Sequence, residues 1–358
     1  MGKFKSTVKR ISTRWFIDAF SGMAQGLFCT LIAGTILGQI AGWVGDNFIG
    51  NTLNYIASLA KTLMGAGVGI GIAHALKCSK LTMFSAAVAG LAGAFSDKIP
   101  AGSFTLVLGA PGNPIGAYVV ALFSIEIASL YAGKTKLDIL LVPLGMMLLT
   151  FIGFYLAYPF IWIIGQLGVL ISKATTITPF LMGIVISVIM GVLLTMPTSS
   201  AAIWISVASG ITDDAMLIAG GAAVVGCSCH MIGFAVASLR ENGVSGLISQ
   251  GIGTSMLQIP NIMKKPVIML PEIISSAILG PISTCVFGLK CNAVGGGMGT
   301  SGLVGVFGVI DSNPDMNGWI LALAIALLIF ILPAVLSFGF SEIFRKAGWI
   351  KFGDQKLE

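Results

Sequence analysis

The chain has 358 residues, of which 56% are hydrophobic and only 9% are charged, and its mean hydropathy is +0.97. A water-soluble globular domain of this size does not sustain such values, so composition excludes that class and predicts an all-α polytopic membrane protein. The net charge of +6 is spread over short hydrophilic pieces. This argues against a nucleic-acid partner and fits contact with anionic membrane lipids.

Basic residues gather at both ends of the chain. Residues 1–16 also carry interleaved apolar side chains, which predicts an amphipathic helix on the cytoplasmic surface, and residues 341–358 form a cytoplasmic tail. By the positive-inside rule both termini are cytoplasmic, and the chain is a multi-pass protein of a bacterial cell membrane. No cleavable signal peptide is expected. The six cysteines lack disulfide-framework spacing, which predicts buried thiols.

Residues 17–172 are predicted to form the first membrane bundle. Four glycines at alternate positions in Leu63–Leu76 allow neighbouring helices to approach closely. A stretch at Asp46–Ala60 mixes polar and apolar residues and is predicted to lie along the interface. The expected crossings are Asp18–Val44, Leu63–Leu76, Leu81–Phe95, Ile115–Tyr131 and Ile139–Leu170.

A proline- and glycine-rich piece, SDKIPAGSFTLVLGAPGNP, interrupts this bundle. Its three prolines exclude a regular helix. It is either an ordinary external loop or a loop that dips towards a solute, in which case Asp97 and Asn113 contact that solute.

Residues 173–340 differ from the first bundle in their hydrophobic pattern, because broken segments alternate with crossings. The piece TMPTSSAAIWISVASGITDD is too short to span a bilayer and suits one arm of a re-entrant hairpin. A weakly apolar stretch, Gly243–Met263, is expected at the cytoplasmic interface, and residues 266–289 are broken by prolines. The crossings are Phe180–Leu194, Ala215–Ala237 and Trp319–Phe338. In all, about eight full crossings and two to three broken ones are expected.

The segment NAVGGGMGTSGLVGVFGVI, residues 292–310, has the apolar length of a crossing but too many glycines for a continuous helix. Non-helical backbone at membrane depth survives only where protein buries it or where it lines a polar cavity. We therefore expect a solute site here, with side chains of Asn292, Thr300 and Ser301 and backbone amides near Gly296 and Gly297.

Two ionisable residues lie inside apolar runs. Glu272 follows Pro271, a position that suits a helix N-terminus, and it is either a solute ligand or a structural carboxylate. His230 bonds a solute or another helix, or is a satisfied core histidine. Cys227 lies three residues before His230, but no second ligand pair supports a metal site.

No cofactor is expected. Residues 297–302 match G-x-G-x-x-G formally, but the strand and helix context of a dinucleotide site is missing. No ATP-binding P-loop motif is present either.

The motifs NAVGGGMGTSGLVG, MLPEIISSAILGPIST, PTSSAAIWISV and SDKIPAGSF together resemble the membrane-permease (enzyme IIC) subunits of the bacterial sugar phosphotransferase system. Within that family the chain is similar to the branch of the perfringolysin-type toxin regulators. The resemblance implies about ten transmembrane helices with two re-entrant hairpins, divided into a dimerising interface half and a transport half that moves like an elevator.

The resemblance also implies a sugar substrate, bound in the transport half by a carboxylate and a histidine, here Glu272 and His230. Phosphorylation would come from separate IIB and IIA proteins, so that the chain is at most the membrane component of a phosphotransferase complex and carries no phosphoryl group itself. The better-known motif places Glu before Pro, whereas Pro271 precedes Glu272 here. Two alternatives stay open: a non-phosphorylating secondary transporter of a small organic solute, and a membrane regulator that acts through a cytoplasmic partner.

Overall fold

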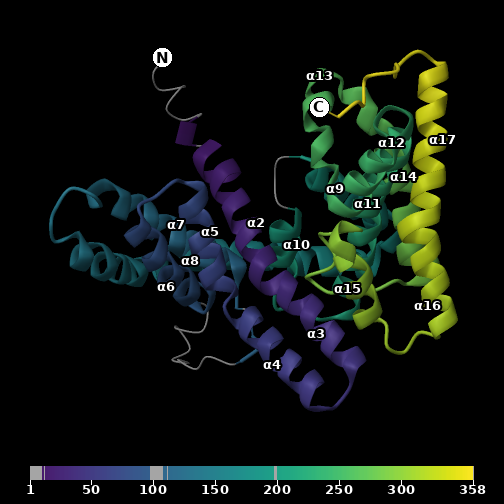
Figure 1. Cartoon of the computed structure of the whole chain (residues 1–358). Coiled ribbons are helices and arrows are strands. Elements are labelled where there is room, and N and C mark those ends of the chain that lie inside the picture. The colour runs from purple at the N-terminus through teal and green to yellow at the C-terminus, as the bar shows by residue number, and fades with distance from the viewer. Residues whose placement is uncertain (1–9, 12, 97–107, 111, 197–199, 358) are drawn as a thin grey trace. The chain divides into compact units, whose positions relative to one another are not determined.

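The computed structural model describes residues 10–357 except 12, 97–107, 111 and 197–199. All regular structure in these residues is helical, which confirms the predicted all-α class. The chain divides into two compact units, Met1–Gln166 and Leu167–Glu358. Figure 1 shows the elements of each unit along the chain.

Unit 1 begins with one long helical rod. Its consecutive parts are η1 (Arg14–Ala19), α2 (Phe20–Leu27), η2 (Phe28–Ile32) and α3 (Ala33–Val44). Next come α4 (Phe48–Thr62) and α5 (Met64–Ala75), which meet at a bend of 53°. α6 (Lys80–Ala94), α7 (Pro114–Tyr131) and the start of α8 (Asp138–Ile177) complete the unit.

The glycines of α5 explain how this unit packs. Gly71 faces Gly22 of α2, and Gly65 faces Gly90 of α6, so α5 presents glycines to helices on two sides. A Cβ added at Gly65 would lie 2.7 Å from the Cβ of Ala94, closer than real Cβ atoms approach. The predicted close approach of helices at these glycines is therefore confirmed.

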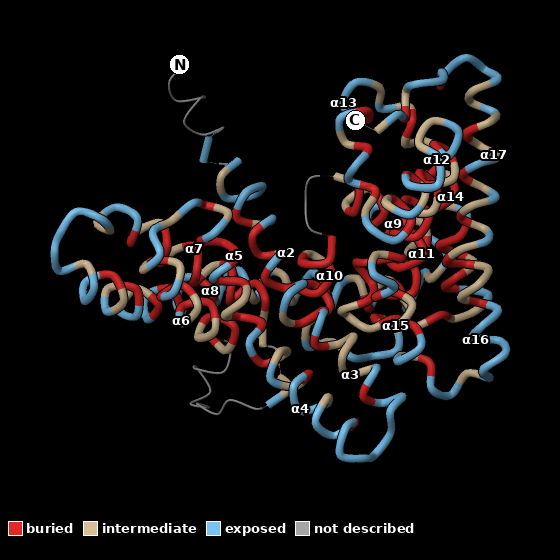
Figure 2. Tube along the Cα trace, in the orientation of Figure 1, coloured by how far each residue is buried: buried red, intermediate tan, exposed pale blue. Residues whose placement is uncertain are grey.

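Unit 2 is built around α11 (Asp214–Ala237), which packs against α9 (Pro179–Thr195), α14 (Leu270–Pro281) and α17 (Leu332–Lys346). Figure 2 shows α11 buried along most of its length. The remaining elements are α10 (Ser200–Ala208), α12 (Leu239–Ile248), η4 (Ser249–Gly253), η5 (Ser255–Gln258), α13 (Ile259–Lys264), η6 (Pro266–Met269), η7 (Ile282–Phe287), η8 (Ser301–Leu303), α15 (Val304–Ser312), α16 (Gly318–Ile325) and η9 (Ala326–Ile331).

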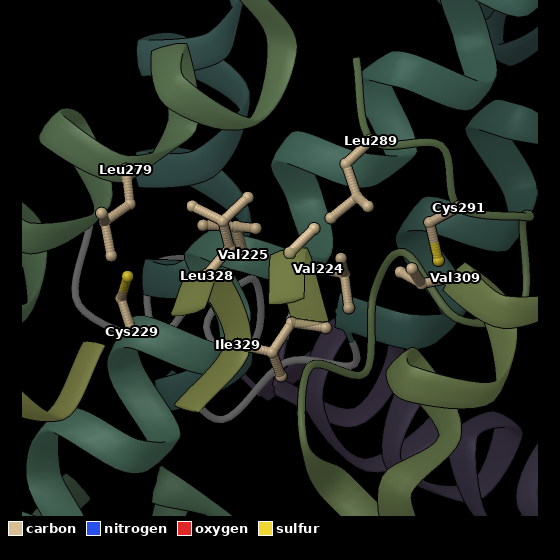
Figure 3. Close-up of a cluster of buried hydrophobic side chains, with 10 residues drawn as sticks. Val224, Val225, Cys229, Leu279, Leu289, Cys291, Val309, Leu328 and Ile329 are labelled. Atoms are coloured by element: carbon tan, nitrogen blue, oxygen red, sulfur yellow. The ribbon is translucent and has the colours of Figure 1, made fainter. Parts of the chain in front are cut away.

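An apolar cluster holds α11 against the later helices. Val224 and Val225 of α11 meet Leu279 of α14 and Leu328 and Ile329 of η9, all of them buried (Figure 3). Between helices in an apolar solvent, close van der Waals packing of such side chains holds the elements together. The cluster thus fixes α11 as the frame on which the polar residues of this unit are carried.

Six helices in the described residues are long and apolar enough to cross a membrane, or seven if the bent α4–α5 pair is one span. They are Arg14–Val44, Pro114–Tyr131, Asp138–Ile177, Asp214–Ala237, Pro266–Phe287 and Gly318–Lys346. α10 is too short to cross. The predicted count of about ten helices and the two re-entrant hairpins stay predictions.

All six cysteines are free. The expectation of buried thiols holds for Cys227, Cys229 and Cys291 but is wrong for Cys29 and Cys285, which are exposed. The reason is that a helix in an apolar solvent keeps apolar side chains on its outer face too, so an apolar run does not by itself imply burial in protein.

Candidate functional site

The middle of α11 is the meeting point of the residues singled out from the sequence. Small residues make this possible: Gly226 packs so closely on Ser187 of α9 that an added Cβ would lie 2.5 Å from the Ser187 Cα. Gly233, two turns further on, is equally close to α14 and α17. Because these glycines bring the backbones together, polar side chains between the helices are cut off from solvent.

His230 is fully buried between α11 and α9. Its Nδ1 lies 2.9 Å from Thr195 Oγ1, which in turn lies 2.9 Å from Ser255 Oγ of η5. The other ring nitrogen, Nε2, has no hydrogen-bond partner among the described residues and faces Gly191, where an added Cβ would lie 2.9 Å from it. The histidine therefore links two helices through Nδ1 and keeps a second polar atom unused.

Glu272 lies in the first turn of α14, just after Pro271, as the sequence predicts for a helix N-terminus. The side chain is fully buried, and neither carboxyl oxygen makes a hydrogen bond within the described residues. Its Cγ packs on Gly233 of α11, beside Ser337 of α17. Burying a carboxyl group without partners is costly, so this arrangement is typical of a group that has a ligand to bind.

The glycine-rich segment does not form a continuous helix. Residues 293–300 make consecutive turns, followed by η8 and α15, and Gly299, Gly302 and Leu303 all have positive φ angles of 52–61°. For Leu303 this left-handed conformation is strained. The predicted break in the segment is thus present, and it falls between residues 292 and 304.

These turns pack tightly on α10 and α11. Ser200 Oγ donates to the Gly297 carbonyl at 2.7 Å, and the buried indole of Trp204 lies directly over Gly296. On the other side, a Cβ at Gly299 would lie 2.8 Å from the Cβ of Cys227. The part of the first broken segment that begins at Ser200 is therefore in contact with the glycine-rich turns.

The polar side chains of the segment are all engaged in holding it. Asn292 Oδ1 accepts from the Gly295 N–H at 2.9 Å, and its Nδ2 donates to Asp311 at 3.0 Å. Thr300 Oγ1 donates to the Gly251 carbonyl at 2.6 Å, and Ser301 Oγ donates to the Gly253 carbonyl at 2.9 Å. These bonds fasten the turns to η4.

Two of the predicted site residues lie elsewhere in the sequence. Asn113 belongs to unit 1, where its side-chain oxygen caps α7 by accepting from Ile115 N and Gly116 N. Asp97 lies outside the described residues. Glu126, a further intramembrane carboxylate of unit 1, forms an ion pair with Arg14 at 2.7 Å and accepts from Trp15 at 3.2 Å.

Sequence analysis missed the contribution of η4 and η5. Weak hydrophobicity predicts that the stretch Gly243–Met263 lies at the interface, yet Gln250, Ser255 and Gln258 are fully buried in it. The sequence carries no clear signal of this burial, because amide and hydroxyl side chains are mostly found on surfaces.

Ser283 Oγ, Ser341 Oγ, Arg345 Nε and Gln355 Nε2 are among the buried polar atoms of unit 2 without hydrogen-bond partners in the described residues. So are both Glu272 oxygens, His230 Nε2 and Trp204 Nε1, which lie on or beside the candidate residues. They offer hydrogen-bond acceptors, a titratable ring and a donor on an aromatic face, the groups with which proteins bind polyhydroxylated solutes. No group of three metal-ligating side chains occurs among the described residues.

Long apolar helices, a glycine-rich break and buried unpaired polar groups on facing helices define a membrane solute carrier. Comparison with protein families makes this specific. Residues 17–357 match the family described as "Phosphotransferase system, EIIC", and the chain belongs to that family. It is thus a membrane component of a sugar permease. Comparisons with curated proteins and with solved structures found no match.

Proposed function

We propose that this chain binds an unphosphorylated sugar or sugar-like solute in unit 2 and carries it across the membrane. Glu272 and His230 are the proposed ligands, with the turns from Asn292 to Ser301 closing the site through Gly296, Gly297 and Thr300. The single observation that supports this most is Glu272, a fully buried carboxyl group with both oxygens unbonded among the described residues. Sugar hydroxyl groups donate strong hydrogen bonds to such oxygens.

In this proposal the two halves have different tasks. Residues 17–172 form the interface half of a homodimer, and residues 173–340 move the sugar inward, with about ten transmembrane helices and two re-entrant hairpins in all. Both termini face the cytoplasm, which the basic residues of the ends support. The narrower similarity to the toxin-regulator branch rests on the sequence motifs alone.

Phosphorylation would take place at the cytoplasmic side. A phosphocysteine of a separate IIB protein, recharged by IIA, would transfer its phosphoryl group to a sugar hydroxyl: the S–P bond breaks, an O–P bond forms, and the hydroxyl proton is released. Unit 2 needs no phosphoryl-carrying residue for this step. Family membership supports the requirement for such partners.

The test is a thermal-shift panel of sugars, sugar acids and sugar phosphates on the detergent-purified chain. A ligand at 100 times its Kd adds about 2.7 kcal/mol to the free energy of unfolding. We expect one unphosphorylated sugar to shift the melting temperature, and Glu272→Gln to abolish the shift. The matched control is Glu342→Gln, because that carboxylate pairs with Arg240 on an exposed face.

A shift that survives in Glu272→Gln would remove this carboxylate from the site. Uptake into vesicles separates the mechanisms. If the same sugar enters without IIA, IIB and a phosphoryl donor, the group-translocation part of the proposal is wrong and a secondary transporter remains.

A further inference from the structure

The segment Lys351–Leu357, here called the strap, follows α17 and lies across α12, η5 and α13. It is held by its main chain. Glu241 accepts from the N–H groups of Gly353 (2.9 Å) and Gln355 (3.0 Å). Asn242 donates to the Gln355 carbonyl (2.9 Å) and accepts from the Leu357 N–H (2.8 Å).

A chain of buried amides continues from the strap into the unit. Gln258 Nε2 donates both to the Gln355 carbonyl at 2.9 Å and to Gln250 Oε1 at 2.8 Å. Gln250 Nε2 donates to Ser238 Oγ, at the end of α11, at 2.9 Å. All four of these residues are fully buried. We call Gln258 and Gln250 the glutamine pair.

The glutamine pair flanks the same short stretch that holds the glycine-rich turns. Gln250 lies in η4, and the next residues of η4, Gly251 and Gly253, offer the carbonyls that Thr300 and Ser301 bind. The position of these carbonyls is therefore set from one side by the glutamine pair and from the other by the turns. A continuous path of hydrogen bonds and short backbone links joins the strap to the glycine-rich segment.

We propose that Gln258 and Gln250 are positioning residues for the solute site: they hold η4, and through it the turns from Gly296 to Ser301, in place when the strap is docked. This rests on the proposed function only in naming the turns as part of the site. Neither glutamine contacts the turns directly, so they act through the carbonyls of Gly251 and Gly253.

The physical argument is that these amides are fully buried and held by several bonds at once: Gln250 Nε2 also donates to the Gly246 carbonyl at 3.0 Å, and Gln258 Oε1 accepts from Asn261 Nδ2 at 2.8 Å. A buried polar group that loses its partner costs about 1–3 kcal/mol, whereas a satisfied one contributes only about 1 kcal/mol. Undocking the strap would leave Gln258 Nε2 with fewer acceptors and expose the pair to water. The η4 backbone contains two glycines and is followed by extended Thr254, and it packs on α11 and α12 as well as on η8.

The experiment is hydrogen exchange, followed by mass spectrometry on the full chain in detergent without added solute. The peptides of interest contain residues 249–254 and 296–305. Both hold amides with hydrogen bonds, including Thr254 N to Ser249 O and Gly305 N to Gly299 O. The test variant is Gln258→Ala. The control is Thr284→Val, which removes a part-buried bond to the Pro179 carbonyl in the same unit, away from the glutamine pair.

In Gln258→Ala we expect both peptides to exchange about tenfold faster, with the middle of α11 unchanged, and we expect no such change in Thr284→Val. Asn242→Ala, which loosens the strap but keeps the glutamine pair, should give a smaller increase in the same two peptides. Faster exchange in 249–254 with 296–305 unchanged would overturn the proposal. A uniform increase along unit 2 would also overturn it, because this is what a purely structural role produces.

The result is independent of the proposed function. If the exchange behaves as expected but no sugar binds, the coupling stands and the permease assignment of the turns fails. If a sugar binds with wild-type affinity to Gln258→Ala and the exchange at 296–305 is unchanged, the permease stands and the positioning role fails.

Discussion

Glu241 offers the sharpest stability prediction, because its carboxylate is fully buried and completely satisfied. Its Oε1 accepts from Arg345 at 3.1 Å and from Gly353 N at 2.9 Å, and its Oε2 accepts from Gln355 N at 3.0 Å. The Arg345 side chain is only 13% exposed, against 0% for that of Glu241. Water therefore has little access to the ion pair between these two side chains.

Glu241→Gln keeps the shape of the side chain but removes the charge and one acceptor. Wherever the new NH₂ group points, it faces at least one N–H donor. Hydrogen bonds to a charged group contribute about 1.5–3 kcal/mol each, and breaking a buried ion pair by removing one partner costs about 3–5 kcal/mol. We expect the free energy of unfolding in detergent to fall by about 3 kcal/mol or more.

The matched control is Glu342→Gln. Its partner Arg240 is 59% exposed and Glu342 itself 27%, so solvent screens the pair and its loss should cost less than about 1 kcal/mol. Both variants are measured by denaturant unfolding in the same detergent. Equal losses in the two would refute the reasoning, since they would mean that the strap residues are as wet as the exposed pair.

Two further predictions concern the strap and the turns. Burial raises the pKa of Asp354, but the hydrogen bond from Lys265, the bond from Lys351 N and the nearby charges of Lys265 and Arg345 outweigh it and hold the pKa below its usual value. The stabilising contribution of Asp354 is therefore complete above the unfolded pKa of about 3.9 and is lost as the pH falls through the lower folded pKa. We expect the difference in melting temperature between wild type and Asp354→Asn to be constant above about pH 5 and to vanish in stronger acid. At the turns, Gly296→Ala should lower the free energy of unfolding by about 1–3 kcal/mol, because the added methyl group overpacks against Trp204. In a double-mutant cycle, Trp204→Phe in the same chain should recover part of that loss. Additive losses in the two variants would show that the indole is not the obstacle.

The helices were predictable because apolar length is a local signal. α7 was expected at Ile115–Tyr131 and runs from Pro114 to Tyr131, and the proline before Glu272 marked the start of α14 correctly. The glycines of α5 likewise indicated a close helix–helix contact, since small residues at this spacing in an apolar helix are typical of such contacts. Neither inference required knowledge of what lies next to the helix.

Partner identity was not predictable. Arg14 and Glu126 are 112 residues apart and Thr300 and Gly251 are 49 apart, and no periodicity connects such pairs. The contact within the glutamine pair was not predictable for the same reason. Gln250 and Gln258 lie on either side of a break at Thr254, so helical spacing does not indicate that their side chains meet. Pairings of this kind are set by tertiary packing alone.

The hydroxyl groups of the broken segments bond to backbone carbonyls in the structure. Ser200 serves the Gly297 carbonyl, and Thr300 and Ser301 serve carbonyls of η4, so these donors satisfy backbone that no helix satisfies. Non-helical backbone in an apolar surrounding needs such donors. In the proposed site, a solute would be recognised mainly by polar atoms left without partners in the described core, such as those on Glu272, His230 and Trp204. In the proposed site, the glycine-rich turns would shape the cavity walls, while the carboxyl group of Glu272 and the rings on α10 and α11 would supply the chemistry that distinguishes one solute from another.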